Sequence, residues 1–220
     1  MHPCRVISAP AQGHSRCLDK FGIEPEEMLR IGFAAAAARN EKTDLMPKFS
    51  GGMLAHIYGV EQLKATFSSV DGYQLGSLQG IDFVWSKERD LKIMFQNVDI
   101  AGSDRFEPEA LSAIGDIKVG MVEGEQQSLF AEFDEAERQR KSKLNEIFKA
   151  QPWFVMVSYS EDGEPALEVS QPRSVEGGNF AKNFVERIFI NREDDPVKLL
   201  EDDSDDNKPT DIKPVITKKR

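Results

Sequence analysis

The chain is poor in the residues that build metal centres and disulfide frameworks. Of its 220 residues, only two are cysteines and three are histidines. Cys4 and Cys17 are too few to form a disulfide framework in a chain of this length. Together with His2 and His14 they match no spacing of a standard structural zinc site. We therefore interpret residues 1–20 as a loose N-terminal lead.

Long hydrophobic runs are also missing. No segment approaches the roughly 18 consecutive apolar residues that a membrane helix needs. Residues 1–20 are mixed and polar, so they lack the apolar core of a signal peptide. We expect a cytoplasmic protein that makes no membrane contact.

Positive charge is in deficit. The 38 acidic residues outnumber the 28 basic ones, and the formal net charge is −10. This balance repels nucleic acid at long range, so a nucleic-acid partner is not expected. A partner protein with a basic surface fits the balance better.

Nucleotide-binding and triad motifs are absent from the sequence. There is neither a G-x-x-x-x-G-K-[ST] phosphate loop nor a G-x-G-x-x-G turn between a strand and a helix. His56 is the only histidine after residue 20, and we interpret it as a hydrogen-bonded structural residue. We expect no cofactor.

What the chain does contain is a large supply of aromatic residues. It has fourteen phenylalanines, and 40% of its residues are hydrophobic, which is enough for a compact core. The composition changes after Asn191, where acidic blocks are interrupted by Pro196, Pro209 and Pro214. Such a segment cannot bury enough apolar surface to order itself. We predict one α+β domain over 21–191 and a disordered acidic tail over 192–220.

Three segments are predicted to be helices. Pro25, Glu26 and Glu27 suit a helix start, and five alanines extend this helix to about Arg39. A second helix is predicted over 53–68 and a third, strongly charged one over 134–150. In the second helix we interpret an apolar stripe as the side that packs on the core; it comprises Leu54, Ile57, Tyr58, Leu63 and Phe67.

Two segments read as β-hairpins. Residues 81–86 and 91–98 flank a charged turn, and 153–159 and 166–170 flank an Asp-Gly turn. Less regular stretches suggest a short helix at 108–114, a strand at 117–122, and a segment 180–190 that begins as helix and ends as strand. The predicted fold is an antiparallel sheet built from two hairpins, packed on one face against three or four helices.

The first hairpin carries a charged constellation. Asp82, Asp90 and Lys92 resemble, in residue type, the active site of PD-(D/E)xK nucleases. That resemblance implies that Asp82 and Asp90 hold Mg²⁺ while Lys92 positions or activates the attacking water. The sequence departs from the family's pattern because Ile81, not Pro, precedes Asp82, and Asp90 also suits a turn.

Two functions follow from these features. The first is a non-enzymatic protein-binding module, an adaptor or inhibitor, for which a homodimer is the assembly we favour. The second is a Mg²⁺-dependent phosphodiesterase centred on the first hairpin. Candidate binding residues are Trp85, Asn97 and Asp99 in or next to the hairpin, and Asp202, Asp203, Asp205 and Asp206 in the tail.

Overall fold

The computed structural model describes residues 5–8, 18–124 and 135–191. Within these residues four helices combine with strands, so the α+β class is confirmed. The predicted disordered tail 192–220 lies outside the described residues, as do the candidate zinc ligands of the N-terminal lead. The helices are α2 (Pro25–Asn40), α3 (Ser50–Ser68), α4 (Asp116–Glu123) and α5 (Glu135–Lys149).

The strands form a seven-stranded mixed sheet in the order β1-β9-β6-β5-β4-β3-β2, and a separate two-stranded ribbon, β7-β8. The pairs β1–β9 and β4–β5 are parallel, and the other neighbours are antiparallel. The bounds are β1 (Arg5–Ser8), β2 (Gln74–Leu78), β3 (Ile81–Ser86), β4 (Leu91–Asn97), β5 (Gln151–Tyr159), β6 (Pro165–Pro172), β7 (Val175–Glu176), β8 (Asn179–Phe180) and β9 (Phe184–Asn191).

The predicted sheet of two hairpins was therefore too simple. The antiparallel pairs β3–β4 and β5–β6 do occur in the predicted segments. However, the long connection through α4 and α5 returns the chain so that β5 runs parallel to β4. Strand β2 forms before β3, in a segment for which we predicted no strand, and β9 begins without a preceding helix. The observed sheet is therefore mixed, whereas we predicted an antiparallel one.

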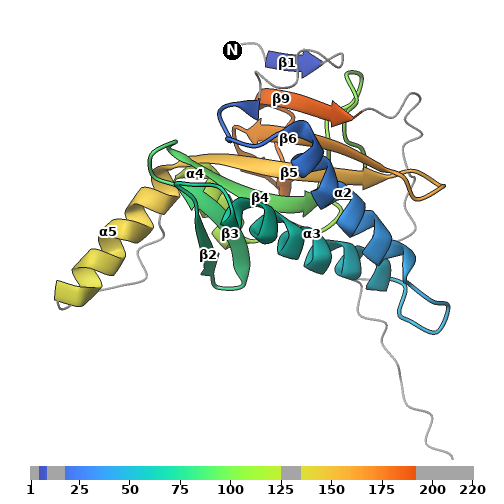
Figure 1. Cartoon of the computed structure of the whole chain (residues 1–220), viewed down its shortest axis with the longest axis horizontal. Coiled ribbons are helices and arrows are strands. Elements are labelled where there is room, and N and C mark those ends of the chain that lie inside the picture. The colour runs from blue at the N-terminus through green and yellow to red at the C-terminus, as the bar shows by residue number, and fades with distance from the viewer. Residues whose placement is uncertain (1–4, 9–17, 125–134, 192–220) are drawn as a thin grey trace, which may run out of the picture.

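Helices α2 and α3 lie side by side on one face of this sheet (Figure 1). Helix α2 begins at Pro25 as predicted, and Glu27 accepts a hydrogen bond from the Glu24 N–H at 3.0 Å, which satisfies a donor at the helix start. The strands present alternate apolar side chains to this face. They include Val84, Ile93, Phe95, Val155, Val157, Leu167, Val169 and Ile188.

Small residues bring α3 close to the sheet. A Cβ placed on Gly59 would lie 2.4 Å from the ring of Phe95, so only glycine fits there without movement. The buried side of the helix follows a four-residue spacing through Gly51, Ala55, Gly59 and Leu63. Ile57 and Tyr58, which we had assigned to the core stripe, are 52% and 43% exposed. The helix is thus rotated relative to the prediction, with its small residues inward.

The opposite face of the sheet is also covered, which corrects the prediction that helices pack on one face only. The segment 117–122 is helical, not a strand: α4 starts after Gly115 and ends at Gly124, whose φ of +72° stops the helix. The segment 108–114 contains no helix. A second core beneath α4 and the end of α5 includes Phe83, Trp85, Met94, Met121, Ile147, Phe148, Phe154, Met156, Phe180 and Phe184.

The folded body extends N-terminally of residue 21, where we had placed its boundary. Leu18 and Phe21 are fully buried, and the Phe21 ring meets Trp153 edge-on with centroids 5.1 Å apart. Strand β1 adds a seventh strand beside β9. Among the described residues, none of the helices is both long and apolar enough to cross a membrane.

The close approach at Gly59 predicts opposite effects for two substitutions in α3. Gly59→Ala should lower the free energy of unfolding by about 1–3 kcal/mol, because the new methyl group displaces the Phe95 ring. Gly52→Ala, where nothing lies within 4 Å of the added Cβ, should raise it by about 0.5–1 kcal/mol because Ala favours helix. Urea denaturation measures both, and a neutral or stabilising Gly59→Ala would contradict the packing.

Candidate functional site

The structure does not bring Asp82, Asp90 and Lys92 together. Asp82 opens β3 and pairs with Lys64 of α3 on the α2–α3 side of the sheet. Asp90 lies beyond the other end of β3, separated from Asp82 by about 13 Å of strand at roughly 3.3 Å per residue. Its φ of +51° and its exposure are those of a turn residue. The two carboxylates therefore do not converge on a shared Mg²⁺ position.

Lys92 has a different role from the one that the nuclease resemblance implies. It is fully buried on the α4–α5 side, and its Nζ donates to the carbonyl oxygens of Ile147, Phe148 and Ala150 at 2.9, 2.8 and 2.7 Å. Burial lowers the pKa of Lys92 to about 7, while three acceptors at the negative end of α5 favour the ammonium form. Lys92 thus closes the C-terminal end of α5.

The other hairpin candidates are used internally. Trp85 is 3% exposed and so presents no surface to a partner. Asn97 donates to the Gly52 carbonyl and accepts from the Tyr159 hydroxyl, both at 2.9 Å, which ties β4 to α3 and β5. Asp99 accepts from the N–H groups of Ile100 and Glu109 and shapes the loop after β4. The four tail aspartates lie outside the described residues.

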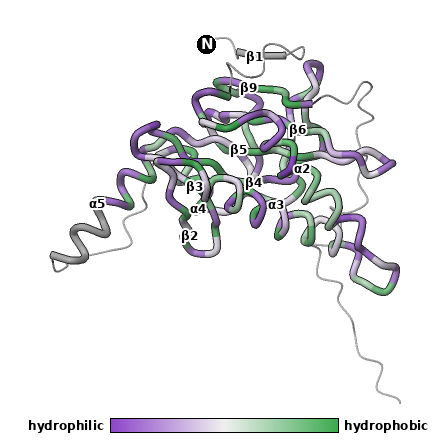
Figure 2. Tube along the Cα trace, in the orientation of Figure 1, coloured by the Kyte–Doolittle hydropathy of each residue, from purple (hydrophilic) through white to green (hydrophobic). Residues whose placement is uncertain are grey.

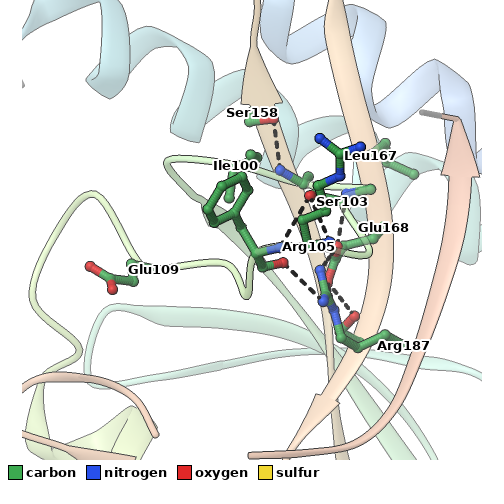
Figure 3. A network of polar contacts seen from close by, with 12 residues as sticks. Ile100, Ser103, Arg105, Glu109, Ser158, Leu167, Glu168 and Arg187 are labelled. Carbon is green, nitrogen blue, oxygen red and sulfur yellow. Dashed lines mark hydrogen bonds and ion pairs between the residues drawn. The ribbon is translucent and has the colours of Figure 1, made fainter. Parts of the chain in front are cut away.

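A buried ion pair on the α4–α5 side was not expected from the sequence. Glu168 of β6 and Arg187 of β9 are 0% and 3% exposed, and they form a two-point contact of 2.6 and 3.0 Å (Figure 3). Glu168 also accepts from the Ser170 hydroxyl at 2.6 Å and from the Gly102 N–H at 2.8 Å. The only sequence signal is Glu168 in one apolar strand and Glu186 and Arg187 in another, which does not identify the pair.

The same network fastens the loop 98–114 onto the sheet. Arg187 donates to the Phe106 carbonyl at 3.1 Å, and the Ala101 N–H donates to the Ser158 hydroxyl at 2.9 Å (Figure 3). Because the charges are paired and their hydrogen-bonding positions are used by the protein, this arrangement is built for structure. It leaves no group of the pair directed at a ligand.

Ionisable side chains meet where β3 separates from β4. The β3–β4 ladder ends at Val84 and Ile93, although β4 continues to Asn97 beside β5. Lys118 of α4 donates to the Gln96 side chain there at 2.8 Å, and burial lowers its pKa to about 8.

His56 of α3 lies near the same strand end, with its ring 5.8 Å from that of Phe95. Partial burial lowers the pKa of His56, the Lys118 charge lowers it further, and Asp82 raises it. Across the described part of the chain, no three His, Cys, Asp or Glu side chains converge on a potential metal position. The group carries no complete catalytic constellation.

Several large apolar side chains are exposed on and between α2 and α3. Half or more of the surface of several large side chains on α2, α3 and their connection is open to solvent, and Leu45 in the connection is 98% exposed. Figure 2 shows hydrophobic segments along both helices and in their connection. We call this surface the α2–α3 face; it comprises Phe33, Leu45, Met46, Phe49, Met53, Ile57 and Tyr58.

Comparison with known proteins adds no family to these observations. No protein-family model matches the chain, and no significant match was found among curated proteins or solved structures.

Loss of the buried arginine should be costly. Arg187→Leu is expected to lower the free energy of unfolding by about 3–5 kcal/mol, because Glu168 would remain buried without its counter-charge. The double variant Glu168→Leu/Arg187→Leu should recover part of this loss. Lys87→Ala, which removes an exposed pair with Glu146, should change stability by only about 0–1 kcal/mol. Urea denaturation that ranks Arg187→Leu with Lys87→Ala would refute the role of the pair.

His56 should titrate below 6.5 in the folded protein. Because the unfolded chain then binds more protons, this residue makes stability fall as the pH drops below about 6.5. Lys118→Met should raise the pKa of His56, and Asp82→Asn should lower it. Proton NMR of the imidazole signal measures each change, and an unaltered titration in Lys118→Met would show that the two side chains do not interact.

Proposed function

We propose that this protein is a non-enzymatic protein-binding module, an adaptor or inhibitor, that docks on its partner through the α2–α3 face. The exposure of seven large apolar side chains on α2, α3 and their connection carries this proposal. A half-exposed Phe, Met or Ile offers roughly 100 Å², so the face presents on the order of 700 Å², above the few hundred Å² usual for a monomer surface. A surface of this kind is typical of a protein interaction site.

The charge of the chain adds a second element to the proposal. A net charge of −10 favours a further partner with a basic surface, which the acidic tail would contact. Asp202, Asp203, Asp205 and Asp206 would extend the contact electrostatically; they lie outside the described residues, and their role rests on charge alone. The proposed setting is the cytoplasm, and the proposed activity needs no cofactor.

The phosphodiesterase alternative has less support. Asp82 is paired with Lys64, Asp90 lies in a turn at the far end of β3, and Lys92 caps α5. These positions do not fit a Mg²⁺ ion held by Asp82 and Asp90, so we do not develop a mechanism through that ion.

Matched variants of the full chain test the docking surface. The tagged protein is incubated with native lysate, and captured proteins are quantified by mass spectrometry for wild type, Met53→Glu and Leu75→Glu. Met53 and Leu75 are 53% and 51% exposed, but only Met53 belongs to the α2–α3 face. We expect proteins enriched by wild type and Leu75→Glu to fall at least about tenfold with Met53→Glu, because the charge would be desolvated at the interface.

A separate arm tests the tail. A variant with Asn in place of Asp202, Asp203, Asp205 and Asp206 should lose basic partners most strongly at low salt, because exposed charges are screened as salt rises. Equal capture by wild type, Met53→Glu and the tail variant would contradict the proposal. The proposal would also fail if the wild-type protein enriched no lysate protein over a tag-only control.

A further inference from the structure

A row of large apolar side chains runs along the exposed side of α3. Phe49, Met53 and Ile57 are 51%, 53% and 52% exposed and are spaced four residues apart, from the residue that precedes the helix into its third turn. Residues at this spacing lie one above the other on a helix and form a ridge. The inner side of α3 is occupied by its contact with Phe95, so the ridge has no partner within the described part of the fold.

The ridge suits contact with an identical ridge. Ridges at four-residue spacing interdigitate in the commonest class of helix packing, with the axes crossing at about −50°. A twofold axis beside Met53 would place Phe49 of one copy near Ile57 of the other, and the two Met53 side chains next to each other in adjacent grooves. An isologous contact of this kind uses one surface twice and closes at two copies.

The charges at the two ends of the ridge favour the antiparallel arrangement. Lys48 precedes Phe49, and Glu61 follows Ile57 at the next four-residue step; both side chains are exposed. Antiparallel contact brings Lys48 of each copy toward the end of the other α3 that carries Glu61, whereas parallel contact would bring like charges together.

The area is also that of a dimer. The α2–α3 face presents on the order of 700 Å² of apolar surface, and a standard interface buries about 800 Å² per partner including its polar rim. Leu45 and Met46 beside the ridge would supply further contact next to Phe49. The face therefore supplies most of the area that a standard interface needs.

We infer that the partner on the α2–α3 face is a second copy of this chain, bound by antiparallel contact between the two α3 ridges. This inference rests on the proposed protein-binding function of the same face and specifies its occupant. It makes the protein a symmetric homodimer in which each ridge is covered by the other.

Sedimentation velocity of the full chain over a range of concentrations tests the dimer. Wild type and Leu75→Glu should sediment as dimers. Ile57→Glu should raise the dissociation constant by at least about 100-fold, because it buries a charge opposite Phe49. Lys48→Glu should weaken the dimer, and Lys48→Glu/Glu61→Lys should restore it. Circular dichroism shows whether each variant is folded.

Cross-linking tests the twofold axis without disturbing the fold. In a Cys4→Ser/Cys17→Ser chain, Met53→Cys should form a disulfide-linked dimer on mild oxidation, because the residue meets its own copy. Leu75→Cys, equally exposed on β2, should remain unlinked. No cross-link at position 53, or dimers that survive Ile57→Glu, would overturn the inferred interface.

A third result separates this inference from the proposed function. If wild type sediments as a monomer at every concentration, yet captures lysate proteins that Met53→Glu loses, the second copy is wrong and the docking surface stands. If neither assay responds to substitutions on the α2–α3 face, both fail.

Discussion

The contact between Gly59 and the ring of Phe95 sets the position of α3, and the surface of the protein follows from it. Because glycine and alanine occupy the inner sides of α2 and α3, both helices lie close to the sheet and to each other. The bulky apolar residues of these helices are then divided: Met28, Leu63 and Phe67 enter the core, whereas Phe33, Met53 and Ile57 face solvent. A helix that buries small residues and exposes large ones leaves a surface for another protein to cover.

Buried charge completes the other side of the sheet. Lys92 holds the end of α5, and the Glu168–Arg187 pair holds the loop 98–114, so hydrogen bonds to buried charges supplement the apolar contacts of both connections. Every side-chain nitrogen and carboxylate oxygen of these charged groups takes part in at least one hydrogen bond within the protein. These buried charges therefore stabilise the fold and are not directed at a ligand. For this reason we place the proposed function on the α2–α3 face.

Local signals in the sequence were sufficient for the elements with clear ends. Pro25 begins α2, and the turn at Asp162-Gly163 joins β5 to β6. Segment 117–122 was assigned to the wrong class because Ile117, Val119 and Met121 alternate like a strand although glycines bound a single short helix. The parallel pairing of β4 with β5 depends on contacts between distant residues, which no local pattern contains.

The candidate site was harder to predict for a related reason. The residue types around Asp82 and Lys92 suggested chemistry, but β-strand alternation sends these two side chains to opposite faces of the sheet. The α3 ridge was overlooked because an apolar stripe is normally read as a core face. Only the depth of contact at Gly59 shows that the small residues point inward.

Methionine oxidation measures that orientation most directly. The full chain, at a nanomolar protein concentration where self-association is weak, is treated with peroxide. The oxidation of each methionine is then followed by peptide mass spectrometry. We expect Met46 and Met53 to oxidise nearly as fast as in the unfolded chain, while Met28, Met94, Met121 and Met156, all fully buried, are protected. If Met53 were as slow as Met28 under these conditions, the outward ridge, and with it the proposed docking face, would be contradicted.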